Sequence, residues 1–266
     1  MFKAFIYLII ILFISLKSFS YENIIFLSST TSTYDSGLLD YLNQKFKKKY
    51  NITVKVLAQG TGQALRTGKE GNVELILVHH KKSELKFMQQ GYGLARYELM
   101  YNDYILVGPK SDTVPCHDIN IKLKEIFTNN YFFISRGDDS GTHKKELELL
   151  FESNIDPYKY SNSYLEVGQG MGNTLLITNE KFSYTLSDRA TWLSFNHKNN
   201  LKVICESQPP LLNQYGLILI NPKVNEKLNI IDAKKYIDWL LSDEGRELIN
   251  NFKINDKQLF FYNYLE

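Results

Sequence analysis

Apolar residues occur along the chain in short runs that alternate with segments of helical periodicity. The run 23–27 ends in a hydroxyl-rich stretch, and from Gly37 apolar residues recur at helical spacing. The runs 52–57 and 73–78 follow, with a short helix expected after Gly60. Three strands separated by helices predict a parallel sheet whose connecting loops gather at its carboxyl edge.

A second set of strands and helices predicts another lobe. The apolar run 104–109 ends at a proline, and the run 131–134 passes through a polar turn into a helix over 144–151. The run 215–222 repeats the pattern of 104–109, an apolar strand closed by proline, and a helix over 233–250 follows it. We interpret the two similar strands as the places where the chain crosses between lobes.

This interpretation predicts a discontinuous first lobe. Lobe I is expected over 21–102 and 209–266, and lobe II over 103–208. The length of 266 residues suits two lobes, because typical domains hold about 100–150 residues.

The first twenty residues have the features of a secretory signal peptide. Lys3 precedes an apolar stretch from Ala4 to Leu16, and small residues precede a predicted cleavage between Ser20 and Tyr21. The alternative is an uncleaved membrane anchor, but the apolar stretch is shorter than the ~20 residues that a spanning helix needs. No cysteine near the cleavage point offers a site for a lipid anchor. We therefore expect export to the periplasm.

Composition describes a globular chain with balanced charge. Of its residues 44% are hydrophobic and 23% charged, which excludes a disordered or collagen-like chain. The formal charge is +2, and removal of Lys3 and Lys17 with the signal peptide would bring it to zero. A strongly basic nucleic-acid-binding protein is therefore excluded, and bulk charge does not select the partner.

The chain has two cysteines, Cys116 and Cys205. An oxidising compartment permits a disulfide between them, which would contribute about 4 kcal/mol through the long loop it closes. Two buried thiols are the alternative, and the sequence leaves both open. No paired histidines accompany the cysteines, so no zinc site is expected.

Four turns combine glycine with serine or threonine at the point where a strand leads into a helix. They lie at 29–32, 60–62, 136–142 and 168–174. The first N–H groups of a helix lack helical partners and carry partial positive charge, glycine permits close approach, and hydroxyl groups donate hydrogen bonds. Any one turn is explained by ordinary helix capping. Four of them on carboxyl edges together predict an anion site.

Arg136 is the one evident cation within these turns. A buried arginine needs an anionic partner, which Asp138, Asp139 or a ligand could supply. The tripeptide Arg-Gly-Asp at 136–138 also occurs in adhesion ligands, but a turn held between a strand and a helix cannot present it freely.

The sequence supports neither a protein-bound metal nor catalysis. His79 and His80 are adjacent on an extended segment, so they point to opposite faces, and no third ligand is spaced with them. We expect them to be loop residues, and His143 to begin a helix. No nucleophile motif and no serine–histidine–acid arrangement is evident, so no catalytic residue is expected. A hydrolase of phosphate esters, the alternative from another class, would need one of these.

Six segments resemble the tungstate-binding proteins of ABC transporters, the TupA type. They are residues 29–40, 60–65, 100–109, 135–143, 168–175 and 184–192. The resemblance implies an α/β type II periplasmic binding fold. Two lobes, each with a mostly parallel central sheet flanked by helices, are joined by a two-strand hinge and close on a tetrahedral oxyanion. The segment His79-His80-Lys81-Lys82 departs from the family pattern, in which one histidine is followed by a small or acidic residue.

The resemblance also implies the ligand, the partners and the site. The ligand would be tungstate, with molybdate, phosphate or sulfate as the alternative, and there would be no further cofactor. A permease and its ATPase in the inner membrane would receive the anion from a monomeric, non-enzymatic protein. The implied ligand-binding residues are Thr30, Thr31, Ser32, Thr61, Gly62, Arg136, Ser140, Thr142, Gly172, Asn173 and Thr174.

Overall fold

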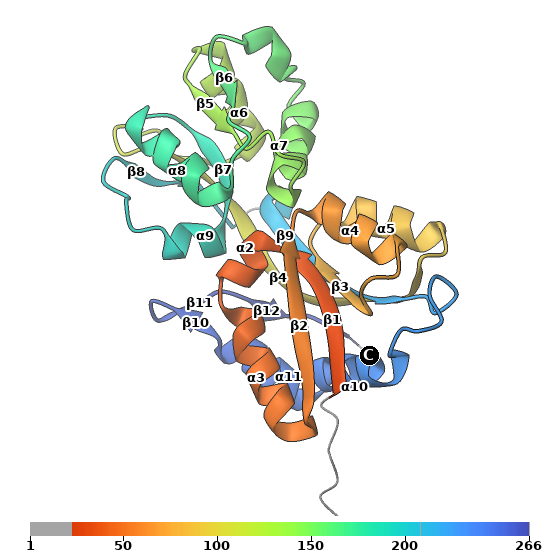
Figure 1. The fold of residues 1–266 in the computed structure, drawn as a ribbon. Coiled ribbons are helices and arrows are strands. Elements are labelled where there is room, and N and C mark those ends of the chain that lie inside the picture. The colour runs from red at the N-terminus through yellow and green to blue at the C-terminus, as the bar shows by residue number, and fades with distance from the viewer. Residues whose placement is uncertain (1–22, 208, 266) are drawn as a thin grey trace, which may run out of the picture.

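The computed structural model describes residues 23–207 and 209–265, and the predicted signal peptide lies outside them. Two lobes lie one above the other and are joined by two long strands (Figure 1). Lobe I is the lower one in Figure 1 and contains the first three strands, and lobe II is the upper one. Within the described residues, no helix has the length and apolar character needed to cross a membrane.

Lobe I is built on a sheet with the strand order β12-β4-β9-β3-β1-β2. Its elements are β1 (Asn23–Thr30), α2 (Thr31–Asp35), α3 (Leu38–Tyr50), β2 (Ile52–Gln59), α4 (Thr61–Lys69), β3 (Leu75–Val78), α5 (Lys81–Gln89), α10 (Ile230–Leu241), α11 (Asp243–Asn251), β10 (Lys253–Ile254), β11 (Lys257–Gln258) and β12 (Phe261–Tyr262). Strand β1 pairs in parallel with both β2 and β3, so the predicted parallel arrangement of these three strands is confirmed.

Strand β3 is entirely apolar because it is buried on both faces of the sheet. Leu75 and Leu77 belong to a core cluster with residues of α3 and α10, while Ile76 and Val78 belong to a second cluster with residues of α4 and α5. Successive side chains of a strand point to opposite faces, so helices cover both faces of the sheet.

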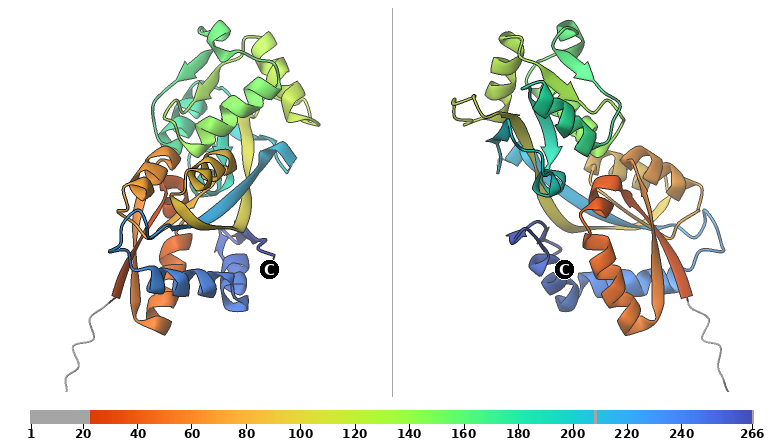
Figure 2. Two further views of the ribbon diagram at one scale, coloured as in Figure 1. Left: turned by 90° about the vertical axis from the view of Figure 1, so that its right-hand side faces the viewer. Right: turned by 60° about the vertical axis from the view of Figure 1, so that its left-hand side comes forward.

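Two strands connect the lobes. Strand β4 (Gly93–Pro109) pairs antiparallel with β9 (Leu212–Ile220) over residues 93–103, and its last residues, 104–109, pair with strands of lobe II. Figure 2 shows β4 and β9 running side by side from lobe I toward lobe II. The sequence predicted only the end of β4, because charged and half-exposed residues interrupt the apolar pattern over 93–103.

Lobe II combines parallel and antiparallel pairs. Its elements are α6 (Ile119–Thr128), β5 (Phe133–Ser135), α7 (Gly141–Glu152), β6 (Tyr164–Glu166), α8 (Met171–Glu180), β7 (Thr185–Asp188), α9 (Arg189–Ser194) and β8 (Leu201–Cys205), with short 3-10 turns at 157–160 and 209–211. Strands β5 and β6 are parallel, whereas β7 and β8 pair antiparallel with β4. The end of β4 is therefore part of the lobe II core.

The helix expected over 233–250 is in fact two helices, and this prediction was wrong. Ser242 has an extended backbone between α10 and α11, and its hydroxyl accepts a hydrogen bond from the Gly245 N–H. A methyl group on Gly245 would lie 2.3 Å from the Leu240 carbonyl oxygen, so glycine is required at this corner. The apolar periodicity continues across the break and therefore hides it.

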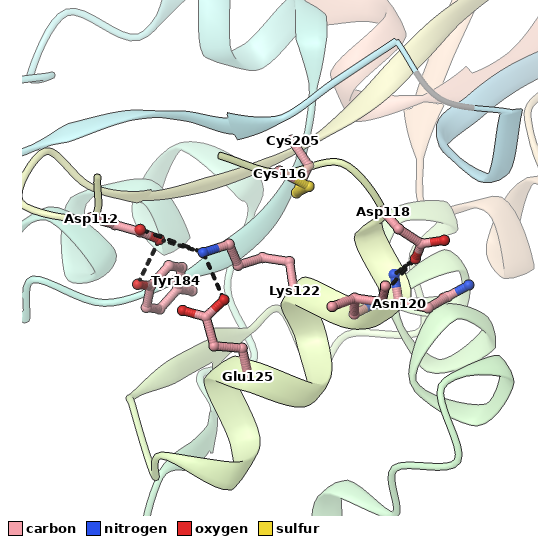
Figure 3. Close-up of a disulfide and its surroundings, with 9 residues drawn as sticks. Asp112, Cys116, Asp118, Asn120, Lys122, Glu125, Tyr184 and Cys205 are labelled. Carbon is pink, nitrogen blue, oxygen red and sulfur yellow. Dashed lines mark hydrogen bonds and ion pairs between the residues drawn. A yellow bond between two sulfur atoms is a disulfide. The ribbon is translucent and has the colours of Figure 1, made fainter. Parts of the chain in front are cut away.

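A disulfide between Cys116 and Cys205 links the loop before α6 to the end of β8 (Figure 3). The two Cα atoms are 5.3 Å apart, and the cysteines are 89 positions apart in sequence. Beside the disulfide, the buried Lys122 ammonium pairs with Asp112 at 3.2 Å and with Glu125 at 3.0 Å. The loop is thus held by covalent and ionic contacts.

Lobe II also buries a carboxyl group beneath the predicted anion-binding turn. Tyr164 Oη donates a 2.7 Å hydrogen bond to Oε1 of Glu146 on α7, and Oε2 has no partner among the described residues. Burial raises the pKa of Glu146 to about 8, although the hydrogen bond from Tyr164 acts in the opposite direction. This side chain therefore carries a proton at neutral pH.

We expect the double variant Cys116→Ser/Cys205→Ser to lose about 4 kcal/mol of unfolding free energy, because the unfolded chain gains the entropy of an opened loop. Urea unfolding of the oxidised wild type and the variant measures the difference. Reductant should destabilise the wild type and leave the variant unchanged. Equal unfolding free energies would contradict a stabilising disulfide.

We expect Glu146→Gln to flatten the fall of stability with rising pH. Above its ordinary pKa of 4.5 this carboxyl ionises in the unfolded chain, yet it stays protonated in the folded chain up to about pH 8, so the unfolding free energy falls as pH rises. The pKa of His79 is lowered to about 3, so this side chain makes the unfolding free energy rise with pH, but only below pH 6.5.

Urea unfolding between pH 6.5 and 8 therefore isolates the Glu146 contribution. The variant's slope should be less negative than that of the wild type by up to about 1.4 kcal/mol per pH unit. Identical slopes would show that Glu146 ionises as freely in the folded protein as in the unfolded chain.

Candidate functional site

Two adjoining cavities between the lobes are lined by residues of the predicted turns. The smaller, of about 140 Å³, is lined by Thr30, Thr31, Ser32, Gln59, Gly60, Thr61, His79, Arg136, Asp138, Ser140, Gly141 and Thr142. The larger, of about 510 Å³, is lined by Thr31, Ser32, Asp35, Ser36, Arg136, Asp138, Gly170, Met171, Gly172, Asn173, Ala190, Thr191 and Ser194. Four residues line both, so the cavities share one wall.

The parallel strands of lobe I bring their carboxyl ends to the smaller cavity. Thr30 is the last residue of β1 and lies in register with Gln59, the last residue of β2, while His79 directly follows β3. Thr30 Oγ1 caps α2 by accepting the Thr33 N–H, and Thr31 Oγ1 donates to the Gln59 carbonyl oxygen at 3.3 Å. Strand topology therefore gathers segments that are distant in sequence.

Lobe II contributes the turn from β5 to α7. Ser140 caps α7 by accepting the His143 N–H at 3.2 Å. Asp138 accepts a hydrogen bond from the Ser140 N–H with one oxygen and pairs with Arg136 through the other, at 2.5 Å. The guanidinium is buried, so the tripeptide 136–138 is not presented as an adhesion ligand would be.

Three buried donors of the smaller cavity have no hydrogen-bond partner among the described residues. They are Thr61 Oγ1, Thr142 Oγ1 and Arg136 Nε. A buried donor without a partner costs about 1–3 kcal/mol. The cavity therefore suits a small ligand whose oxygens accept hydrogen bonds.

Acidic groups stand at the wall of the larger cavity. Asp138 is neutralised by Arg136, whereas Asp35 on α2 has no ion pair within the part of the chain that the structure describes. Burial raises the pKa of Asp35, and the nearby Asp188 carboxylate adds to the rise. The larger cavity is therefore less suited to an anion than the smaller one.

The structure brings most of the predicted site residues together. Seven line the smaller cavity: Thr30, Thr31, Ser32, Thr61, Arg136, Ser140 and Thr142. Gly172 and Asn173 line the larger cavity, and Gly62 and Thr174 line neither. A methyl group on Gly62 would lie 2.5 Å from an oxygen of Asp139, and Thr174 Oγ1 donates to the Gly170 carbonyl oxygen.

Sequence reasoning missed several lining residues, above all His79. Its position after an all-apolar strand was a usable signal, because such strands end at the sheet edge where the other turns gather. Thr191 and Ser194 on α9 had no comparable signal. His80 is a loop residue as predicted, and its ring caps α5 by accepting the Ser83 N–H. No group of three metal-ligating side chains occurs within residues 23–207 and 209–265.

A family model and a curated relative both match most of the chain. Residues 20–244 match the profile of the PBP superfamily domain. The chain is 46% identical over 233 residues to the tungstate-binding protein TupA of Peptoclostridium acidaminophilum, covering 86% of this chain and 81% of that protein.

Two solved structures are also similar to this chain. The tungstate-binding protein TupA of Desulfovibrio alaskensis superposes with a TM-score of 0.81 at 36% identity, over 91% of this chain and 100% of that one. The tungstate ABC transporter protein of Geobacter sulfurreducens superposes with a TM-score of 0.79 at 40% identity, over 88% and 100% of the two chains.

Proposed function

Because the chain belongs to the PBP superfamily and, within it, to the family of the TupA proteins, we propose that it binds tungstate between its two lobes. It would deliver the anion to the permease and ATPase of an ABC transporter. The family consists of substrate-binding transport proteins, so the chain is a binding protein and not an enzyme. Its fold is the α/β type II periplasmic binding fold.

The observation that carries the proposal is the convergence of unpartnered donors on one small interlobe cavity. Thr61 comes from lobe I, and Thr142 and Arg136 from lobe II, so a ligand held by all three would bridge the lobes. Tungstate at neutral pH is a dianion without a proton. It needs hydrogen-bond donors, and the guanidinium and both hydroxyl groups can donate.

The charges that line the smaller cavity are compatible with a dianion held mainly by neutral groups. Asp138 already balances the charge of Arg136, so helix amino ends and hydroxyl groups supply the remaining attraction. About seven charge-assisted hydrogen bonds at roughly 1.5–3 kcal/mol each give about 10–20 kcal/mol, against about 12 kcal/mol for nanomolar affinity. The binding free energy can offset the cost of bringing the lobes together only if the site excludes water and its groups are already in place.

We propose direct contacts for the residues that line the smaller cavity and a supporting role for the others. Gly62 would offer a backbone N–H from the first turn of α4, and Gly172 and Asn173 would approach from the first turn of α8. Thr174 would hold that turn through its bond to Gly170.

We further propose that the protein acts as a monomer in the periplasm. Its signal peptide would be cleaved between Ser20 and Tyr21. The lobe boundaries would lie between residues 102 and 103 and between 208 and 209.

We expect Arg136→Ala to weaken tungstate binding at least about tenfold, because a charge-assisted bond to the anion is lost. Isothermal titration of ligand-stripped protein measures the dissociation constant, and circular dichroism verifies folding. Arg246→Ala, which removes the same charge from an exposed site on α11, should bind like the wild type.

The first substitution also leaves Asp138 unpaired beside the anion. Arg136→Ala/Asp138→Asn removes that repulsion and should recover part of the loss. An unchanged affinity in folded Arg136→Ala protein would contradict the proposed site.

We expect phosphate to compete poorly with tungstate near pH 7. Protonated phosphate needs an acceptor, and the carboxylate that lines the smaller cavity, Asp138, is already engaged by Arg136 and by the Ser140 N–H. Competition titration with tungstate, molybdate, sulfate and phosphate gives the order of affinities. Displacement of tungstate by equimolar phosphate would favour the alternative function as a phosphate-binding protein.

A further inference from the structure

His79 is a buried titratable side chain for which the proposed anion contacts leave no role. Its ring lies between the two strands that join the lobes. Nδ1 is 2.8 Å from Oη of Tyr104 on β4, and the ring centroid is 4.9 Å from that of Tyr215 on β9. All three side chains are buried. The imidazole is therefore anchored to the hinge.

The same ring touches the opposite lobe. A methyl group on Gly141, the first residue of α7, would lie 2.6 Å from Cε1 and 3.0 Å from Nδ1 of His79, and 3.2 Å from Thr61 Oγ1. Carbon atoms do not approach to 2.6 Å, so lobe I presses against α7 where only glycine fits. This contact lies at the wall of the smaller cavity.

The chemistry of the ring suits a spacer better than a ligand. Burial lowers the pKa of His79 to about 3, and the nearby Arg136 acts in the same direction, so the ring is neutral. Burial also keeps the Tyr104 hydroxyl protonated by raising its pKa. A neutral imidazole can thus accept the Tyr104 hydrogen bond at Nδ1 without placing a second charge beside Arg136.

We propose that His79 is a positioning residue that sets the distance between the lobes in the arrangement that the structure shows. Its ring transmits the hinge geometry of β4 and β9 to the amino end of α7 and so fixes the width of the anion cavity. The predicted changes in tungstate affinity rest on the proposed function. The predicted change in the distance between the lobes does not depend on which ligand binds.

A double-mutant cycle between Gly141 and His79 tests the proposal. Gly141→Ala should weaken tungstate binding about tenfold, because the methyl group forces the lobes apart. In the His79→Ala background the space left by the ring accepts the methyl group, so the same change should cost less than about threefold. Alanine favours the helix, so Gly141→Ala should fold, which a melting curve verifies.

The control background is His197→Ala, which removes an exposed histidine elsewhere on lobe II. Gly141→Ala should cost as much in this background as in the wild type. An equal loss in the His79→Ala background would overturn the proposal and would mean that the anion itself requires glycine at this position.

Small-angle X-ray scattering provides a readout that does not depend on affinity. Gly141→Ala should have a larger radius of gyration than the wild type at saturating tungstate and in ligand-free protein, and His79→Ala should reverse the increase. Absence of any increase would overturn the proposal. If the wild type does not bind tungstate, the proposed function fails, and ligand-free scattering still decides the role of His79.

Discussion

Strand β4 is shared by both lobes, and the geometry of the site depends on this continuity. Its first part pairs with β9 in the lobe I sheet, and its last six residues pair with β7 and β8 in lobe II. Backbone hydrogen bonds on both sides hold one uninterrupted strand in two cores. A change of twist along β4 therefore alters the distance between the lobes.

The cavity lies where the sheet topology and this hinge meet. Parallel strands β1, β2 and β3 end at one edge of lobe I, and the turn from β5 to α7 faces them from lobe II. Each half supplies only some of the donors. A ligand that satisfies both halves would be bound most tightly when the lobes are together, which is the energetic condition for a protein that closes on its substrate.

The site combines few charges with many donors. Arg136 is buried and pairs with the half-buried Asp138, which avoids the large cost of an isolated buried cation. Uncharged hydroxyl groups and helix amino ends make up the rest. An anion bound in this cavity would be attracted by oriented dipoles and not by bulk charge, so the net charge would carry no sign of it.

The parallel strands of lobe I, the hydroxyl-rich turns and the fold family can all be predicted from the amino-acid sequence. These features depend on local periodicity, on capping chemistry and on segments whose residue order is distinctive. The resemblance to the tungstate-binding proteins implied eleven ligand-binding residues, and seven of them line one cavity.

The break at Ser242 is a local feature that the continuing apolar periodicity hides. The length of β4, the disulfide and the contacts of His79 emerge only in the folded structure. Each depends on partners distant in the chain: β9 pairs with the polar part of β4, the two cysteines approach across 89 residues, and His79 meets Gly141 from the other lobe. Such contacts leave no local periodicity in the sequence, since burial and register arise only when the strands and lobes pack together.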